Sequence, residues 1–323
     1  MMRGMVQELE SNNGYPRVVG ESPEWIDTLK KATQVAETDT TVLLTGESGT
    51  GKEVVARFIH RASSRKGGPF TALNCAALPE HLLESELFGY ERGAFTGAQQ
   101  SKPGQIELAA GGVLFLDEVG EMSPSAQAKF LRVVQEREFQ RLGGTRLLKA
   151  NVRIVAATNR DLRKAVERRA FREDLYYRLQ VFDIRLPPLR ERKRDIVPLC
   201  DAFLQEIAKS FGRPPAGLTR DAREALLRHD WPGNVRELRN ALERAAILCE
   251  GGLINASHLS LYMPPIRAGE APTTVLDTVE RDMIAQVLHD SRWNKSKAAK
   301  RLGLSRTQLY WRLRKYDLGQ PSA

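Results

Sequence analysis

A Gly-rich loop between two regular elements constrains the fold of this chain more than any other segment. The run GESGTGKE at 46–53 follows the apolar run TVLLT at 41–45 and precedes the amphipathic stretch 53–62. Strand, Gly-rich loop and helix in this order form a P-loop, whose backbone N–H groups curl around a phosphate at a helix N-terminus. The phosphate site predicted from this pattern consists of Gly46, Glu47, Ser48, Gly49, Thr50, Gly51, Lys52 and Glu53.

Two positions of the loop decide how it would handle a nucleotide. Lys52 can reach the β- and γ-phosphates. Glu53 stands where the general P-loop has a Ser or Thr that holds Mg²⁺, so the metal must be left to other ligands. The alternative is a Gly-rich turn with a solvated lysine, and the strand–loop–helix context argues against it.

Polar side chains end two further apolar runs. The run VLFLDE at 113–118 ends with Asp117, placed to hold Mg²⁺, and Glu118, placed to polarise the attacking water as a general base. The run VRIVAATN at 152–159 ends with Thr158 and Asn159, a pair that suits a sensor of the γ-phosphate. A solvated acidic strand end is the alternative, but the P-loop in the same chain favours ATP hydrolysis.

Short β-rich runs alternate with helical stretches up to about residue 188, which predicts an α/β doubly wound parallel sheet. The segment 187–195, PPLRERKRD, ends this pattern, and the chain then reads as helical to about 262 with a turn at 231–234. A second break rich in Pro, Gly and small residues looks like a linker. The predicted boundaries are an N-terminal linker at 1–17, an α/β core at 18–188, a helical lid at 189–263, a linker at 264–274 and a small all-α domain at 275–323.

Composition narrows the partners and the compartment. The 323 residues carry a net charge of +9, which makes a polyanion an expected partner. Cys75, Cys200 and Cys249 are far apart and odd in number, which argues for a reducing cytoplasm, and each is expected to be a small buried apolar residue. The sequence shows neither a signal-peptide core nor an apolar run long enough to span a membrane, so we expect a cytoplasmic protein without a membrane partner.

The C-terminal region has the pattern of a helix-turn-helix. Apolar residues between 275 and 288 share one helical face, Gly303 suits a turn, and nine Lys or Arg but no Asp or Glu stand between Ser291 and Tyr316. A solvated helical face is the alternative, and the absence of acids favours DNA. Ser305 and Gln308 form a capping box at the start of the second helix. The side chains expected to contact base edges are Arg306, Thr307, Gln308 and Tyr310. Phosphates would be contacted by Lys295, Lys297, Lys300, Arg312, Arg314 and Lys315.

Together these residues resemble one family, the sigma-54-dependent transcriptional activators of the AAA+ class. The P-loop GESGTGKE has the family's form, so Glu53 fits the family while departing from the general motif. The run LNCAAL at 73–78 resembles the family's switch segment, which implies that Asn74 pairs with Glu118. The run GAFTGA at 93–98 resembles the loop that contacts the sigma factor, with the residues Gly93, Ala94, Phe95, Thr96, Gly97 and Ala98.

The resemblance extends to arginines. The segment FREDLYYRL at 171–179 is similar to the one that carries trans-acting arginines, which implies roles for Arg172 and Arg178 at a neighbouring subunit. Which of the two is the main finger stays open, because a spacing of six does not place both on one helix face. The run WPGNVRELRN at 231–240 resembles the sensor II segment of the lid, with Arg236 reaching the nucleotide.

The resemblance implies an AAA+ ATPase with a helical lid and a Fis-type DNA-binding domain. Such a protein binds enhancer DNA, assembles from dimers into a hexameric or heptameric ring, and uses ATP and Mg²⁺ to open the closed sigma-54 polymerase complex. A DNA-binding regulator of the AAA+ fold without remodelling activity, or another AAA+ machine, are the alternatives. Fewer than twenty residues precede the core, so control in trans and a truncated chain both stay open.

Overall fold

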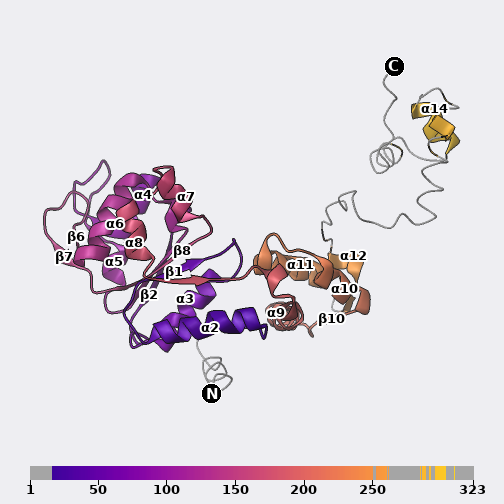
Figure 1. Ribbon diagram of the computed structural model, residues 1–323, viewed down its shortest axis with the longest axis horizontal. Helices are drawn as coiled ribbons and strands as arrows, with labels where there is room; N and C mark the ends of the chain where they lie inside the picture. The colour runs from indigo at the N-terminus through magenta and orange to yellow at the C-terminus, as the bar shows by residue number, and fades with distance from the viewer. Residues whose placement is uncertain are drawn as a thin grey trace. The chain divides into compact units, whose positions relative to one another are not determined.

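The computed structural model describes residues 17–249, 252–259, 261, 284, 286–288, 291, 295–302 and 309 (Figure 1). Contacts within the chain divide it into two units, Met1–Leu261 and Tyr262–Ala323. The first unit contains a sheet with helices on both faces, followed by a smaller helical part. The described residues of the second unit form part of a small helical cluster.

A five-stranded parallel sheet forms the centre of the first unit (Figure 1). Its strands are β1 (Val42–Thr45), β2 (Phe70–Asn74), β5 (Val113–Asp117), β8 (Arg153–Thr158) and β9 (Phe182–Arg185). They lie in the order β2-β5-β8-β1-β9, and every pairing is parallel. Because the carboxyl ends of parallel strands share one edge, the residues that follow β1, β5 and β8 lie near one another. The predicted α/β parallel fold is confirmed.

Strand β5 shows why the central strands read as continuous apolar runs. Leu114 and Leu116 belong to a core shared with the helices α4 (Glu80–Phe88), α6 (Pro124–Glu136) and α8 (Glu173–Leu179). Val113 and Phe115 belong to a core shared with α2 (Pro23–Ala36) and α3 (Lys52–Ala62). Side chains alternate between the faces of a strand, so a strand covered on both faces is apolar at every position. Helices cover both faces of the sheet, α2 and α3 on one side and α4, α6 and α8 on the other.

The helix that follows the P-loop agrees closely with the predicted stretch 53–62. The P-loop helix α3 spans Lys52–Ala62, and α6 spans Pro124–Glu136, where Ser123 caps its N-terminus by accepting from the Ala126 N–H. The other helices are α2 (Pro23–Ala36), α4 (Glu80–Phe88), α5 (Gln105–Leu108), α7 (Leu162–Glu167) and α8 (Glu173–Leu179). Two short antiparallel pairs, β3 (Gly89–Tyr90) with β4 (Lys102–Pro103) and β6 (Glu138–Phe139) with β7 (Leu148–Lys149), project from the sheet and its helices.

One buried charge in the sheet departs from the apolar pattern. Arg153 at the start of β8 is fully buried, and its guanidinium donates to the carbonyls of Val35 at 2.7 Å and Ala36 at 3.0 Å. These are the last carbonyls of α2, which have no partner within their own helix. Arg153 therefore ties the end of α2 to the central sheet.

The lid follows the sheet and has its own core. Its elements are η2 (Leu189–Glu191), η3 (Lys193–Asp195), α9 (Ile196–Phe211), β10 (Gly217–Leu218), α10 (Arg220–Arg228), α11 (Asn234–Leu248), β11 (Leu253–Ile254) and α12 (Ala256–Leu259). Trp231, in the predicted turn, is fully buried in this core, and its indole N–H donates to the carbonyl of Leu226. The prediction of an all-helical lid was wrong in one detail, since β10 and β11 form a short parallel pair.

In the second unit, α14 spans Lys295–Arg301. Ala298 and Ala299 are buried in a cluster with Ile284, Leu288 and Leu309, as expected for small residues at a close helix contact. Lys295, Lys297 and Lys300 lie on α14. The remaining predicted DNA-contacting residues lie outside the described residues, and these are Ser305, Arg306, Thr307, Gln308, Tyr310, Arg312, Arg314 and Lys315.

The cysteines differ from one another in burial. Cys75 and Cys200 are buried as predicted, whereas Cys249, at the end of α11, is only half-buried. The expectation of burial at Cys249 was therefore wrong, because the residue follows the last turn of its helix at the edge of the lid core. Within the described parts of the chain, none of the helices combines the length and the apolar character that a membrane span requires.

Candidate nucleotide-binding site

The P-loop connects β1 to α3 at the carboxyl edge of the sheet. Gly51 precedes α3 without any side chain that caps the helix, so the first N–H groups of α3 stay open to an anion. Gly49 has a φ of +78°, and a Cβ there would lie 2.4 Å from the carbonyl oxygen of Gly233 in the lid. Only glycine fits this position, because both the left-handed backbone and the close approach exclude a side chain.

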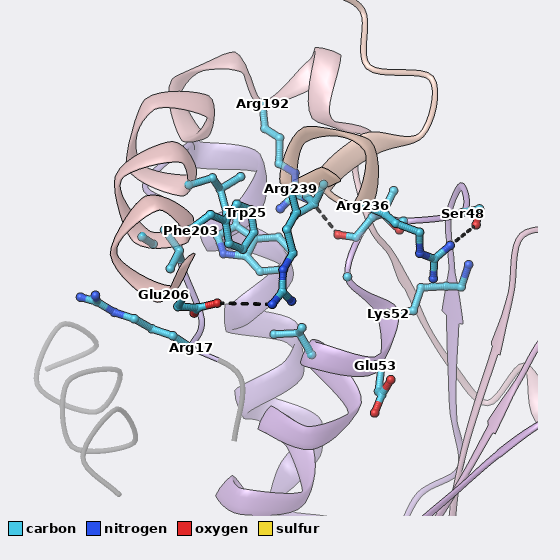
Figure 2. A pocket seen from close by; sticks show the side chains of 18 of the residues that line it. Arg17, Trp25, Ser48, Lys52, Glu53, Arg192, Phe203, Glu206, Arg236 and Arg239 are labelled. Atoms are coloured by element: carbon cyan, nitrogen blue, oxygen red, sulfur yellow. Dashed lines mark hydrogen bonds and ion pairs between the residues drawn. The ribbon is translucent and has the colours of Figure 1, made fainter. Parts of the chain in front are cut away.

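A cavity of about 690 Å³ opens over the P-loop, between the sheet and the lid (Figure 2). Loop residues 48–53 and the acids Asp117 and Glu118 form one wall, and Arg236 and Arg239 of α11 form another. Trp25, Leu199 and Phe203 give the far end an apolar and aromatic character. A volume of this size suits a nucleotide-sized ligand. Six of the eight predicted phosphate-site residues thus share one cavity with both acids, whereas Gly46 and Glu47 do not line it.

Lys52 and Glu118 meet inside this cavity. The Lys52 ammonium group lies 3.5 Å from Glu118 Oε1 and donates to the carbonyl of Gly46 at 3.0 Å. The other carboxylate oxygen of Glu118 accepts from the backbone N–H of Asn159 at 3.1 Å. Glu118 also has a φ of +53°, which is rare for a residue with a side chain and is a form of backbone strain found at functional sites. The predicted general base is therefore held by two neighbours and by its own backbone.

Asp117 ends β5 beside Glu118 and is half-buried. Burial raises the pKa of its carboxyl, and the charge of Glu118 raises it further. Burial also raises the pKa of the neighbouring Cys75 thiol to about 12, with smaller contributions from Asp117 and Glu118. Negative charge is therefore concentrated at this strand end, where a bound cation would relieve it. Among the described residues, no cluster of three or more His, Cys, Asp or Glu side chains is placed to hold a metal alone.

Asn74 lies at the same edge but does not contact Glu118. It ends β2 directly beside Asp117, and its side-chain oxygen accepts from the N–H of Ala76 at 2.8 Å. The carboxylate of Glu118 is instead directed to Lys52 and Asn159. The expected pairing of Asn74 with Glu118 is thus not formed in this structure, in which the Glu118 carboxylate is engaged by Lys52 and by the N–H of Asn159.

Arg236 reaches the P-loop from the lid, and its guanidinium donates to the Ser48 hydroxyl at 2.9 Å (Figure 2). A second arginine, Arg192, also lies at this site, and sequence reasoning missed it. Arg192 is buried with its guanidinium 4.3 Å from the centroid of the Trp25 ring, and it donates to the carbonyl of Thr50. Burial lowers the pKa of Arg192 to about 10. The arginine-rich run 190–194 was the available signal, but its pattern does not say which arginine turns inward.

Both predicted trans-acting arginines lie outside the cavity of their own chain. Arg172 stands at the N-terminus of α8 and pairs with Asp174, and Arg178 lies in the last turn of the same helix. Both side chains are exposed. The residue before Arg178, Tyr177, is also exposed, which makes this end of α8 partly apolar.

The loop at 93–98 lies between β3 and β4. The Gly93 N–H donates to the Ala98 carbonyl at 2.8 Å, which closes the base of the loop, and Ala98 is buried. Phe95 is 47% exposed, and its ring meets the edge of Tyr90 with 5.0 Å between centroids. The ring thus rests on a neighbour with one side and faces solvent with the other. Thr96 beside it is exposed as well.

Three models of known protein families together match nearly the whole sequence. Residues 18–185 match the model for the sigma-54 interaction domain. Residues 190–274 match the AAA+ ATPase lid domain, and residues 275–316 match the bacterial regulatory protein, Fis family.

Curated relatives agree with these matches. The chain is 48% identical to the Nif-specific regulatory protein of Azotobacter vinelandii over 97% of its own length and 61% of the relative's. It is 43% identical to the regulatory protein AtoC of Escherichia coli strain K12, covering 98% of this chain and 71% of AtoC. The chain thus spans about three fifths of the length of the Nif-specific relative.

Solved structures give the same fold. The chain is similar to NtrX from Brucella abortus, crystallised in complex with ADP, with a TM-score of 0.73, 34% identity, and coverage of 98% of this chain and 72% of NtrX. A structure of NtrX in complex with ATP matches with the same TM-score. Hsp104 matches with a TM-score of 0.54 and 17% identity, which is a likeness of fold alone.

Proposed function

The chain belongs to the sigma-54-dependent transcriptional activators, and we propose that it uses ATP hydrolysis to convert the closed sigma-54 RNA polymerase complex at a promoter into the open complex. The observation that carries this proposal is the joint presence of two features. One is the cavity that unites Lys52, Asp117 and Glu118 with the P-loop. The other is the loop at 93–98, which presents a half-exposed phenylalanine.

The residues of the cavity divide the chemistry of hydrolysis among them. The P-loop N–H groups and Lys52 bind the phosphates, and Arg236 closes over them from the lid. Glu118 accepts the proton of the attacking water, and the N–H of Asn159 holds its carboxylate in orientation. Asp117 and phosphate oxygens would hold Mg²⁺, which neutralises the charge that develops on the phosphates.

Arg172 and Arg178 act, in this proposal, on the nucleotide of a neighbouring subunit. Both are exposed and neither lines the cavity of its own chain, which supports this role. The active unit is then a ring, hexameric or heptameric, and each site is complete only at a subunit interface. An arginine supplied by a neighbour is a common device in ATPases and GTPases.

Loop 93–98 is the proposed contact with the sigma factor. The aromatic ring of Phe95 is half-exposed at a loop between short strands. Covering such a ring with a partner surface removes apolar area from water and so favours binding. The Fis-type region at 275–316 is the proposed enhancer-binding part, with Lys295, Lys297 and Lys300 of α14 contacting phosphates. Such a protein acts in the bacterial cytoplasm, where its DNA and polymerase are found. We retain the boundaries 18–188, 189–263 and 275–323 as the proposed division into core, lid and DNA-binding domain.

A regulator that binds DNA but does not remodel polymerase is the second candidate. ATP turnover separates the two, because that regulator has no need of an intact P-loop lysine. We expect Lys52→Ala to abolish ATP binding measured by calorimetry and to leave enhancer binding in a gel-shift assay intact. Lys31→Ala is the matched control, since Lys31 is an exposed lysine on α2 that pairs only with Asp27. A wild-type protein that neither binds nor hydrolyses ATP would support the second candidate instead.

A further inference from the structure

The lid holds four consecutive residues of the P-loop, from Glu47 to Thr50. Glu47 and Ser48 accept from the side chain of Asn234, the Gly49 carbonyl accepts from the Val235 N–H at 3.0 Å, and the Thr50 carbonyl accepts from Arg192 at 2.6 Å. These contacts come from two lid segments, 189–192 and 233–236. The outer side of the P-loop is thus bound to the lid residue by residue, while its inner side faces the cavity.

Asn234 is the residue that joins the two lid segments to the loop. It is 0% exposed, and its φ of +51° lies in the left-handed region. Its side-chain oxygen accepts from the Leu189 N–H at 2.8 Å, which ties the start of the lid to the start of α11. Its amide nitrogen donates to Glu47 Oε2 at 3.1 Å and to the Ser48 carbonyl at 3.0 Å. Both the oxygen and the nitrogen of this buried side-chain amide therefore have hydrogen-bond partners.

Glu47 completes the junction from the P-loop side. Its carboxylate pairs with the Arg190 guanidinium through two hydrogen bonds of 2.5 and 2.8 Å, a bidentate geometry that fixes orientation. Although Glu47 belongs to the P-loop, it does not line the cavity, unlike residues 48–53. Its side chain is directed to Arg190 and Asn234. Its carboxylate therefore contacts the lid and not the cavity.

A P-loop held in this way cannot change its shape without breaking contacts to the lid, and the lid cannot rotate without pulling on the loop. We propose that Asn234 is a positioning residue that, together with Glu47, couples the lid to the P-loop and thereby sets the rate at which the nucleoside diphosphate leaves. The inference rests on the proposed ATPase function and deepens it. In the proposed function, Lys52 and Glu118 carry out the chemical step. Neither Asn234 nor the Glu47 carboxylate contacts these two side chains.

Three variants separate this role from a general structural one. Asn234→Asp keeps the acceptor for the Leu189 N–H but removes the amide donor and places a second carboxylate beside Glu47. Asn234→Gly removes the side chain and keeps a residue that tolerates the left-handed backbone. The double variant Asn234→Asp with Glu47→Gln exchanges donor and acceptor, because a glutamine amide at 47 can donate to the aspartate.

The experiment follows release of a fluorescent N-methylanthraniloyl ADP from the full chain, chased with excess ADP in a stopped-flow instrument. We expect Asn234→Asp to release it about 10-fold faster, the scale of one lost hydrogen bond to a charged group, and the double variant to recover much of the wild-type rate. The KM for ATP should rise with the loss of affinity, while the single-turnover hydrolysis rate at saturating ATP stays unchanged. Glu224→Gln, which breaks an exposed ion pair on lid helix α10, is the control.

Release at the wild-type rate in Asn234→Asp would overturn the proposal. So would an equal loss of binding and of single-turnover chemistry, because that pattern reports a damaged fold. If the asparagine variants do not fold, the release rate of the ADP analogue from Glu47→Gln alone decides the question. Glu47 is partly exposed, so its substitution leaves the lid core intact. A wild-type protein that binds no ADP analogue would overturn the ATPase function together with this inference, whereas normal wild-type binding with unchanged variant rates overturns the coupling alone.

Discussion

The Glu118 carboxylate lies 3.5 Å from the Lys52 ammonium group, within the same cavity. The two residues come from different βα units of the sheet, and strand β8 lies between their strands β1 and β5. The ion pair holds the carboxylate and the ammonium group side by side, and the N–H of Asn159 holds the other carboxylate oxygen. The pairing therefore links the residue proposed to bind phosphate to the residue proposed to activate water.

Glu118→Gln should bind ATP with near-normal affinity and hydrolyse it at least about 10²-fold more slowly, because an amide cannot accept the proton of the attacking water. Steady-state phosphate release and calorimetric ATP binding, measured on the same preparation, check both parts. Glu121→Gln is the matched control, since Glu121 lies three residues later in the short helix η1 (Val119–Glu121), outside the lining of the cavity, and pairs with Arg160. Near-normal turnover in Glu118→Gln would remove this residue from the role of base.

Asp117→Asn should stabilise the fold at neutral pH. Burial, followed by the charge of Glu118, raises the pKa of Asp117, so the folded protein binds this proton more tightly than the unfolded chain does. Ionisation of Asp117 at neutral pH therefore opposes folding, and a neutral amide of the same shape removes that penalty. Urea denaturation should show a higher free energy of unfolding for the variant.

The pH dependence of this gain is a second test of the same cause. The advantage of Asp117→Asn should shrink as the pH falls toward about 3.9, the ordinary aspartate pKa, because Asp117 then becomes protonated in both states. Asp161→Asn is a useful contrast. The Asp161 side chain caps α7, and its backbone hydrogen bond to Lys164 lowers its pKa, so this substitution should destabilise the protein at neutral pH. A loss of stability at neutral pH in Asp117→Asn would contradict the account.

The central strands and the P-loop could be predicted from the sequence, but the edges of the sheet could not. β1, β5 and β8 are covered on both faces and read as apolar runs, whereas β2 is an edge strand whose residues are half-buried or exposed. Strand β9, at the other edge, alternates in burial and contains Asp183 and Arg185. Edge strands lack the continuous apolar signal because only part of their surface is covered.

The contacts between lid and P-loop were also beyond prediction. Arg190 and Asn234 lie far from Glu47 in the sequence, and residue types alone do not tell which polar side chains meet after folding. Arg192 stands in an arginine-rich segment that reads as solvated, yet it is buried on Trp25. By contrast, Lys52, Asp117 and Glu118 could be placed together, because a P-loop and a strand ending in two acids share the same sheet edge.

Arg178→Ala subunits should lose ATPase activity by about 10³-fold or more, because each site lacks the charge that a neighbour supplies. Mixing them with Glu118→Gln subunits should restore part of the activity. In a mixed ring, an intact Glu118 and an intact Arg178 can meet at the same interface.

Colorimetric phosphate release from the two variants, alone and mixed, measures this complementation. Arg220→Ala is the control, because Arg220 is an exposed arginine on lid helix α10. Mixtures that show only the sum of the separate rates would argue that Arg178 acts within its own chain or not at all. The same mixing with Arg172→Ala tells which of the two arginines is the main finger.

Phe95→Ala should abolish capture of sigma-54 in the presence of ADP and aluminium fluoride, while leaving ATPase activity and stability close to wild type. The ring is half-exposed and touches Tyr90 by one edge, so its removal leaves no buried cavity. Thr96→Ala should behave in the same way. Native gel electrophoresis with labelled sigma-54 measures the capture. Leu227→Ala, which truncates an exposed apolar residue of the lid, serves as the control. Unfolding of Phe95→Ala would show instead that the ring is a packing residue.

The central claim is that this chain couples ATP hydrolysis to the opening of sigma-54 promoter complexes. The most direct measurement is the yield of heparin-resistant open complexes, formed in vitro from sigma-54 polymerase, promoter DNA with its enhancer, and this protein. We expect open complexes with ATP, none with ADP or a non-hydrolysable ATP analogue, and none with Glu118→Gln, which should still bind ATP. Open complexes that form without hydrolysis, or their absence from a wild-type protein that hydrolyses ATP and binds the enhancer, would contradict this claim.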